Sequence, residues 1–184
     1  ITDRLGFARS VLREQIGVMC QVLVDEGGDE VVAVVVAVAH AQREQLDYTL
    51  GSVRLTGVAD IGRAKAEVAA ERLATLNRDV VLDAIATHAT RENVDGFVAG
   101  YDLVVECTDN FRAKFLVNDA VVRAGKPAVF ASVHQYEGQL QVYRPEPDWP
   151  CLRCLWPAAP RDGLVGNCAE AGVLGPVPAT LGAM

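Results

Sequence analysis

Polar side chains concentrate in segment 106–110, Glu-Cys-Thr-Asp-Asn, directly after a run typical of a buried parallel strand. Ligands bind in the crevice at the carboxyl ends of such strands. An aspartate there can hold a divalent cation that bridges nucleotide phosphates, which makes Asp109 a candidate metal ligand. Asp and Thr are also ordinary helix N-caps, so capping is the alternative role of Asp109.

Cys151 and Cys154 have the Cys-x-x-Cys spacing of half a four-cysteine zinc site. A second such pair is absent from the sequence. Cys107, Cys168 and His134 are the candidate completing ligands. Two incidentally close thiols are the alternative, and a half-site is the expectation.

Two further side chains could take part in catalysis or in ligand binding. Cys168 lies in the glycine-bearing segment 166–172, where it is either an exposed nucleophile or a passive thiol, since reactivity needs a lowered pKa. Lys65 stands near a predicted helix start, where a long cation reaches a bound phosphate. A solvated surface lysine is the alternative.

The elements that must position these residues alternate between helical and strand patterns from residue 60 onward, which predicts an α/β fold. Apolar spacings of three and four predict a helix over 63–76. A β-branched run from Val80 to Leu82 favours a strand. A short helix is expected after Thr90, ending at Gly100, and the strand 102–106 follows.

The helix after this strand is bounded by clear signals. Segment 108–110 supplies N-capping residues, and Gly125 with Pro127 stops the helix. Its expected buried stripe is Ala113, Leu116, Ala120 and Ala124.

Two more strands are expected, over 128–131 and, as an antiparallel edge strand, over 138–143, so the sheet is predicted to be mixed. Seven of the eight prolines fall between residues 145 and 184. They predict a loop-rich tail that packs over the sheet's active end.

The first 58 residues carry weaker signals. Val22–Val24 is typical of a strand, whereas the apolar run 31–39 suits either a buried strand or a core helix. Gly27 and Gly28 are flanked by four carboxylates, which would repel phosphate. No GxGxxG or Walker motif occurs in the sequence.

The composition limits the class of protein. A chain of 184 residues, half of them hydrophobic, suits one globular domain spanning 1–184. The net charge of −7 disfavours nucleic acid as a partner. The longest apolar run has nine residues, against the ~20 of a membrane-spanning helix. The amino terminus lacks a secretory signal pattern, and a cytoplasmic location with reduced thiols is expected.

Six separated segments also resemble one known family, and they occur in its order. They are 60–67 (DIGRAKAE), 106–111 (ECTDNF), 118–120 (NDA), 137–139 (EGQ), 151–155 (CLRCL) and 168–176 (CAEAGVLGP). Over residues 59–184 the chain resembles the ThiF/MoeB/HesA family, the bacterial relatives of ubiquitin-activating enzymes. The resemblance implies a Rossmann-like, mixed and mostly parallel sheet flanked by helices.

It also implies an activity. Such enzymes use ATP and Mg²⁺ to adenylate the carboxy-terminal glycine of a ubiquitin-like sulfur-carrier protein in thiamin, molybdopterin or related thiolation pathways. By motif, Asp109 matches the magnesium-associated aspartate and Lys65 the phosphate-contacting lysine. Arg9 resembles an arginine that reaches the neighbouring subunit's ATP site, which implies a homodimer.

The remaining matches concern the nucleotide and the thiols. Asn110, beside Asp109, and Arg54, near the expected arginine register, are candidate nucleotide contacts. Cys168 aligns with a cysteine that in some members bonds covalently to the carrier or to a sulfur intermediate. The Cys151–Cys154 pair corresponds to the first half of a structural zinc tetrad.

Two function hypotheses of different classes follow. The first is an ATP-dependent adenylyltransferase for a sulfur carrier. The second is a non-catalytic homologue that docks the carrier without binding ATP, since the family's glycine-rich loop is not legible between Arg9 and Lys65. A nicotinamide-dependent oxidoreductase shares the sheet but lacks the dinucleotide fingerprint, so it is a distant third.

Overall fold

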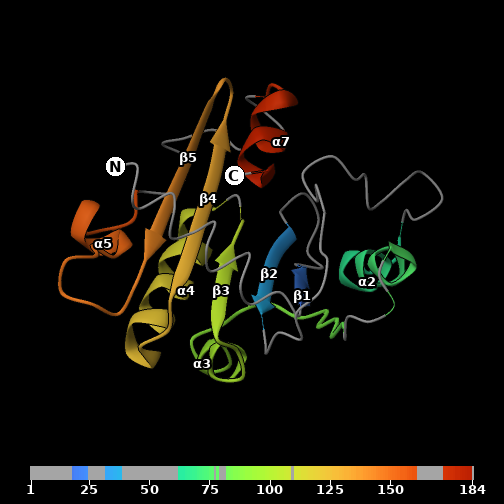
Figure 1. Ribbon diagram of the computed structural model, residues 1–184, viewed down its shortest axis with the longest axis horizontal. Helices are drawn as coiled ribbons and strands as arrows, with labels where there is room; N and C mark the ends of the chain where they lie inside the picture. Colours follow the sequence, from blue (N-terminus) through green and yellow to red (C-terminus); the bar gives the residue numbers. More distant parts are fainter. Residues whose placement is uncertain are drawn as a thin grey trace.

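The computed structural model describes residues 18–24, 32–38, 62–76, 78, 82–108, 110–160 and 172–183. Within these residues the fold is a five-stranded sheet flanked by helices, with the strands in the order β1-β2-β3-β4-β5 (Figure 1). The strands are β1 (Val18–Val24), β2 (Val32–Val38), β3 (Leu103–Glu106), β4 (Ala128–His134) and β5 (Glu137–Tyr143).

The sheet is mixed, as expected. β3 and β4 are parallel, with Glu106 opposite Phe130, and the other three neighbouring pairs are antiparallel. Parallel pairing is therefore less extensive than expected, since the sheet was predicted to be mostly parallel. The difference arises because the apolar run 31–39 forms β2, which pairs antiparallel with both β1 and β3. The expected strands at 22–24, 102–106, 128–131 and 138–143 are all present.

Helices cover this sheet and its edges. They are α2 (Lys65–Leu76), α3 (Val94–Ala99), α4 (Phe111–Ala124), α5 (Leu152–Leu155) and α7 (Pro176–Ala183). α4 passes behind β4 in Figure 1 and packs against α3, whereas α2 lies against β1 and α7 against β4 and β5. None of the described helices is long and apolar enough to cross a membrane.

α4 begins and ends where the sequence indicates. The Asn110 side-chain oxygen accepts a hydrogen bond from the backbone N–H of Ala113 at 2.7 Å, which caps the helix. Gly125 ends the helix in the left-handed conformation, with φ of 61°. Both signals are local, so they could be found from the chain alone.

The expected buried stripe of α4 is only partly right. Ala120 is buried, Ala113 and Leu116 are half-buried, and Ala124 is exposed. The side chains that the helix buries include two polar residues, Lys114 and Asn118. The full buried set is Lys114, Phe115, Val117, Asn118, Ala120 and Val121. The buried arc is wider than an apolar stripe because these polar side chains find partners in the interior.

The core lies between α3, α4 and the strands β3, β4 and β5. Its buried members are Val94, Val98, Val104, Val117, Ala120, Val121, Ala128, Phe130 and Tyr143. Branched and aromatic side chains of the parallel pair thus face the apolar surface of α4. This packing fixes the position of α4 relative to β3 and β4.

Two expectations along the chain differ from the described structure. Of the strand expected to begin at Val80, the structure describes only the part from Leu82 onward, and residues 82–86 form no strand. Val80 itself lies outside the described residues. The short helix begins at Val94, since Thr90 and Asn93 form a turn in which the Asn93 side chain accepts from the Thr90 N–H at 2.7 Å.

The tail is less loop-like than its prolines suggest. Pro176 is the first residue of α7, a position where a missing N–H costs nothing. α7 packs so closely on β5 that a Cβ at Gly138 would lie 2.9 Å from Leu181 Cδ1. The Leu174 N–H also donates to the Gln135 carbonyl at 2.8 Å. As expected, this part of the tail packs at the carboxyl end of β4.

Candidate functional site

The first candidate site is the crevice at the carboxyl ends of β3 and β4, the parallel pair among the described strands. Glu106 is the last residue of β3, and Asn110 caps α4 four residues later. The Thr108 hydroxyl donates to the Asn110 carbonyl at 3.4 Å. The loop between strand and helix is therefore short and tied to the start of α4.

A buried ion pair fixes the base of this loop. Lys114 Nζ lies 2.7 Å from Glu106 Oε2 and donates to the Ala131 carbonyl at 2.7 Å. Glu106 Oε1 accepts from the Thr108 N–H at 2.7 Å. Both residues are buried: Lys114 is 6% exposed and Glu106 is 0% exposed. One ammonium thus joins α4, β3 and β4 directly beneath the loop that carries Asp109.

The charges of this base set the chemistry of the neighbouring thiol. Burial raises the pKa of Glu106, and the Lys114 ammonium and the hydrogen bonds with Lys114 and Thr108 oppose that rise. Burial and the Glu106 charge together raise the pKa of Cys107 to about 11. The Cys107 thiol therefore stays protonated at neutral pH in the absence of a bound cation, which makes it a poor nucleophile.

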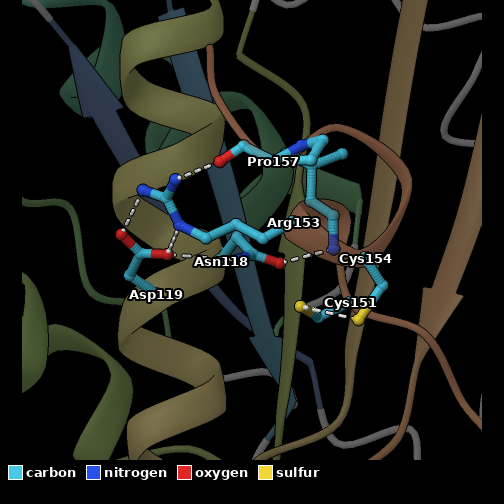
Figure 2. Close-up of polar contacts among 7 residues, drawn as sticks. Asn118, Asp119, Cys151, Arg153, Cys154 and Pro157 are labelled. Atoms are coloured by element: carbon cyan, nitrogen blue, oxygen red, sulfur yellow. Dashed lines mark hydrogen bonds and ion pairs between the residues drawn. The ribbon is translucent and has the colours of Figure 1, made fainter.

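The second candidate site is the cysteine turn, defined here as residues 151–154. Cys151 is the N-cap of α5, and the two sulfurs face each other at 3.7 Å (Figure 2). Burial alone would raise the pKa of Cys151, but hydrogen bonds from Cys154, Arg153 and Asn118 outweigh it and hold that pKa below its ordinary value. The turn therefore favours a thiolate at Cys151.

The sulfur geometry fits a zinc ion. Two thiolates at ~2.3 Å from a tetrahedral Zn²⁺ are about 3.8 Å apart, close to the observed spacing. A disulfide would require about 2.05 Å between the sulfurs. Cys151 and Cys154 are both free thiols. The residues present thus suit two of the four ligands of a Zn²⁺ site.

The proposed completing ligands do not join the pair. Among the residues that the structure describes, no group of three or more His, Cys, Asp or Glu side chains is placed to hold a metal ion. Cys107 and His134, both described, are therefore wrong as third ligands. Each belongs to the β3–β4 end of the sheet, whereas the cysteine turn is held by the middle of α4. Cys168 lies outside the described residues.

The other predicted site residues are placed only in part. Asn110 is described and serves as an N-cap, and Lys65 is the first residue of α2. Asp109, Arg9 and Arg54 lie outside the described residues, so their roles stay predictions.

Sequence reasoning assigned no role to the polar residues that build both sites. These are Glu106, Lys114, Asn118, Asp119 and Arg153. One signal was available, since Lys114 and Asn118 are four residues apart and interrupt an apolar helix face. Polar residues at that spacing on a packed face indicate buried partners.

Comparisons with known proteins identify the family. The model of the ThiF family matches residues 54–184. The chain belongs to the ThiF family. The match begins after β2, so β1 and β2 lie before it.

Several members of the ThiF family are similar in sequence. The chain is 45% identical over 130 residues to the sulfur carrier protein adenylyltransferase of Thermus thermophilus, covering 68% of this chain and 48% of that protein. It is 42% identical over 123 residues to the SAMP-activating enzyme E1 of Haloferax volcanii, covering 67% and 45%. It is 44% identical over 128 residues to mouse adenylyltransferase and sulfurtransferase MOCS3, covering 70% and 28%. The chain thus spans about half or less of the length of these relatives.

Solved structures agree on the fold. A crystal structure of Escherichia coli MccB with ATP matches with a TM-score of 0.56 and 22% sequence identity, covering 76% of this chain and 43% of that chain. MccB with MccA-N7isoASN gives a TM-score of 0.58 at 22% identity, covering 76% and 44%. At this identity the likeness shows the Rossmann-like fold expected from the sequence.

Proposed function

We propose that the chain carries part of an ATP-dependent adenylyltransferase that activates the carboxy-terminal glycine of a ubiquitin-like sulfur-carrier protein. The observation that carries the proposal is the ThiF match over residues 54–184, together with 45% identity to a relative named for this activity. The crevice at the ends of β3 and β4 is the proposed nucleotide site. Thiamin, molybdopterin and related thiolation pathways use carriers of this class.

The reaction converts a poor electrophile into a good one. The carrier carboxylate attacks the α-phosphorus of ATP, a carboxylate–phosphate bond forms, and pyrophosphate leaves with the electron pair of the broken P–O bond. Lys65 and Arg54 are proposed to offset phosphate charge, and Asn110 to contact the nucleotide from the start of α4. Arg9 is proposed to complete the site of a second subunit, which requires a homodimer.

Asp109 is proposed to hold Mg²⁺ in this crevice. When bound, Mg²⁺ neutralises phosphate charge during the transfer. The described neighbours of Asp109 support this role, because the Lys114–Glu106 pair fixes the β3 end and Asn110 takes over the capping of α4. An aspartate that the helix does not need as its cap is available for a ligand.

The thiols have separate proposed roles. Cys151 and Cys154 are proposed to supply half of a structural Zn²⁺ site, and Cys168 to form a covalent bond with the carrier end or with a sulfur intermediate. Free thiols at Cys151 and Cys154 suit a reducing cytoplasm, where we place the protein.

A second candidate is a carrier-docking homologue without ATP binding. It is favoured by one observation, the lack of a GxGxxG or Walker motif in the sequence, together with the acidic residues around Gly27 and Gly28. The two candidates predict opposite results for nucleotide affinity. Calorimetry with ATP and Mg²⁺ separates them, because only the adenylyltransferase is expected to bind nucleotide and so to give a heat of binding.

The activity itself is tested by carrier-dependent exchange of pyrophosphate into ATP, using the full-length native protein. Asp109→Asn is expected to lower the exchange rate at least ~100-fold if the carboxylate holds Mg²⁺ against phosphate. The matched control is Asp83→Asn, which alters an exposed aspartate and is expected to leave the rate unchanged. Full activity in Asp109→Asn would overturn the Mg²⁺ role of Asp109, and no exchange with any carrier would remove the proposed activity.

A further inference from the structure

The cysteine turn rests on a helix too short to hold itself. α5 has four residues, and isolated helices below ~12 residues are marginal in water because nucleation is costly. Inside the turn the Cys154 N–H donates to the Cys151 carbonyl at 3.0 Å, and contacts from outside must keep so short a turn in this conformation. Those contacts come mainly from α4, which has 14 residues and is packed into the core.

Asn118 holds the beginning of the turn. Its side-chain oxygen accepts a hydrogen bond from the Leu152 N–H at 2.8 Å, across 34 residues of sequence. Leu152 is the first residue of α5, so this bond satisfies an N–H that lacks a partner within the helix. This bond fixes the backbone next to Cys151, but it does not constrain the residues after Leu152.

Arg153, which lies between the two cysteines, connects the rest of the cysteine turn to α4. Its Nε and Nη2 donate to the two carboxylate oxygens of Asp119 at 2.6 and 2.7 Å, and its Nη1 donates to the Pro157 carbonyl at 3.1 Å. Figure 2 shows this side chain reaching from the turn across to Asp119 on α4. Its guanidinium also lies 5.0 Å from the centre of the Phe115 ring.

Such a two-pronged pair sets orientation as well as distance, since the planar guanidinium matches the carboxylate. The residues next to Arg153 in the turn therefore move little relative to α4. Asn118, Asp119, Cys151 and Arg153 also line one open hollow in the surface, together with Val122 and Arg123. The hollow thus brings the anchoring pair together with one of the two thiols, Cys151.

We propose that Asp119 is a positioning residue for the two thiols. Through Arg153 it holds the Cys151–Cys154 turn at its metal-binding spacing before a metal ion arrives. This inference rests on the proposed Zn²⁺ half-site but not on adenylation. Partners of this kind, which orient ligands without touching the metal, typically change metal affinity 10- to 100-fold.

The test is a titration of the reduced protein with Co²⁺ and Cd²⁺, followed by thiolate-to-metal charge-transfer absorption. Asp119→Asn keeps one acceptor but places an amide N–H₂ against the guanidinium, so we expect about a tenfold loss of affinity and fewer thiolates per ion. Asp119→Glu retains the carboxylate and is expected to recover most of the affinity. A role in stability alone would not change the number of thiolates bound per ion.

The matched control is Asp95→Asn. Asp95 forms a 2.6 Å ion pair with Arg123, which lines the same hollow, yet it does not contact the cysteine turn in the described structure. Its metal affinity should equal that of the unaltered protein. Should Asp119→Asn fail to fold, Arg153→Lys keeps the charge, loses the two-pronged bond and is expected to show the same loss.

The outcomes distinguish the positioning role of Asp119 from the Zn²⁺ half-site on which it rests. Unchanged affinity in Asp119→Asn or in Arg153→Lys would overturn the positioning role while leaving the half-site intact. Absence of charge transfer in the unaltered protein would overturn the half-site and the inference with it. Because the titration needs neither ATP nor carrier, a failure of adenylation would not affect either result.

Discussion

Replacing Lys114 with Met should be the most destabilising single change at the carboxyl ends of β3 and β4. Met is similar in length but has no ammonium, so Glu106 would remain in the interior without its counter-charge. Both the Glu106 contact and the Ala131 hydrogen bond, each 2.7 Å, would be lost. Breaking a buried ion pair on one side costs about 3–5 kcal/mol, compared with a total stability of about 5–15 kcal/mol for a domain.

The pH dependence of this variant follows from Glu106. Burial already raises the pKa of Glu106 above its ordinary value of 4.5, and loss of the Lys114 ammonium would raise it further. Below that ordinary value the carboxyl is protonated in both the folded and the unfolded chain, so it adds no penalty. As the pH rises, the unfolded chain releases the proton first, and the folded state loses stability until the raised pKa is passed. The deficit of Lys114→Met should therefore grow from pH ~4.5 upward.

Urea unfolding followed by circular dichroism measures this deficit at several pH values. The double variant Glu106→Gln with Lys114→Met removes the stranded charge and should recover part of the lost stability. A single variant within ~1 kcal/mol of the unaltered protein would refute the reasoning, because exposed pairs contribute no more than that. A double variant no more stable than Lys114→Met would also refute it.

Three smaller effects are expected. Gly138→Ala should cost about 1 kcal/mol and speed hydrogen exchange in α7, because its Cβ would lie 2.9 Å from Leu181 Cδ1; unchanged exchange would contradict the close packing. Asn110→Ala should lower the free energy of unfolding by about 1 kcal/mol, measured by urea unfolding, through loss of the α4 cap, whereas Asn110→Asp should retain most of it. Asp95→Asn should change the same quantity by less than ~1 kcal/mol, since its pair with Arg123 is exposed, and a larger loss would show that the pair is not a surface contact.

The parts of the fold that the sequence predicted are those with local signals. The capping segment 108–110, the Gly125 stop and the apolar run of β3 each depend on a few adjacent residues, and each is confirmed, with Asn110 as the residue of the segment that caps α4. The run 31–39 was ambiguous because continuous apolar residues suit a strand or a helix, and its pairing with β3 decides the matter only in three dimensions.

The polar framework of both sites depended on contacts between distant residues. Asn118 bonds to Leu152, 34 positions away, and Lys114 to the Ala131 carbonyl, 17 positions away. No local pattern specifies such partners, so both polar residues were missed in the expected stripe of α4. The sequence did predict Cys151 and Cys154 as a half-site, because metal-ligand spacing within one turn is itself a local property.

We propose that this ThiF chain belongs to an enzyme that adenylates a carrier carboxylate. The most direct measurement is the intact mass of a ubiquitin-like sulfur carrier after incubation with the full-length protein, ATP and Mg²⁺. We expect the carrier to gain one adenylyl group at its carboxy-terminal glycine, and to keep its original mass when Asp109 of the enzyme is replaced by Asn. A carrier that binds the protein but keeps its original mass would contradict the claim and favour the docking homologue.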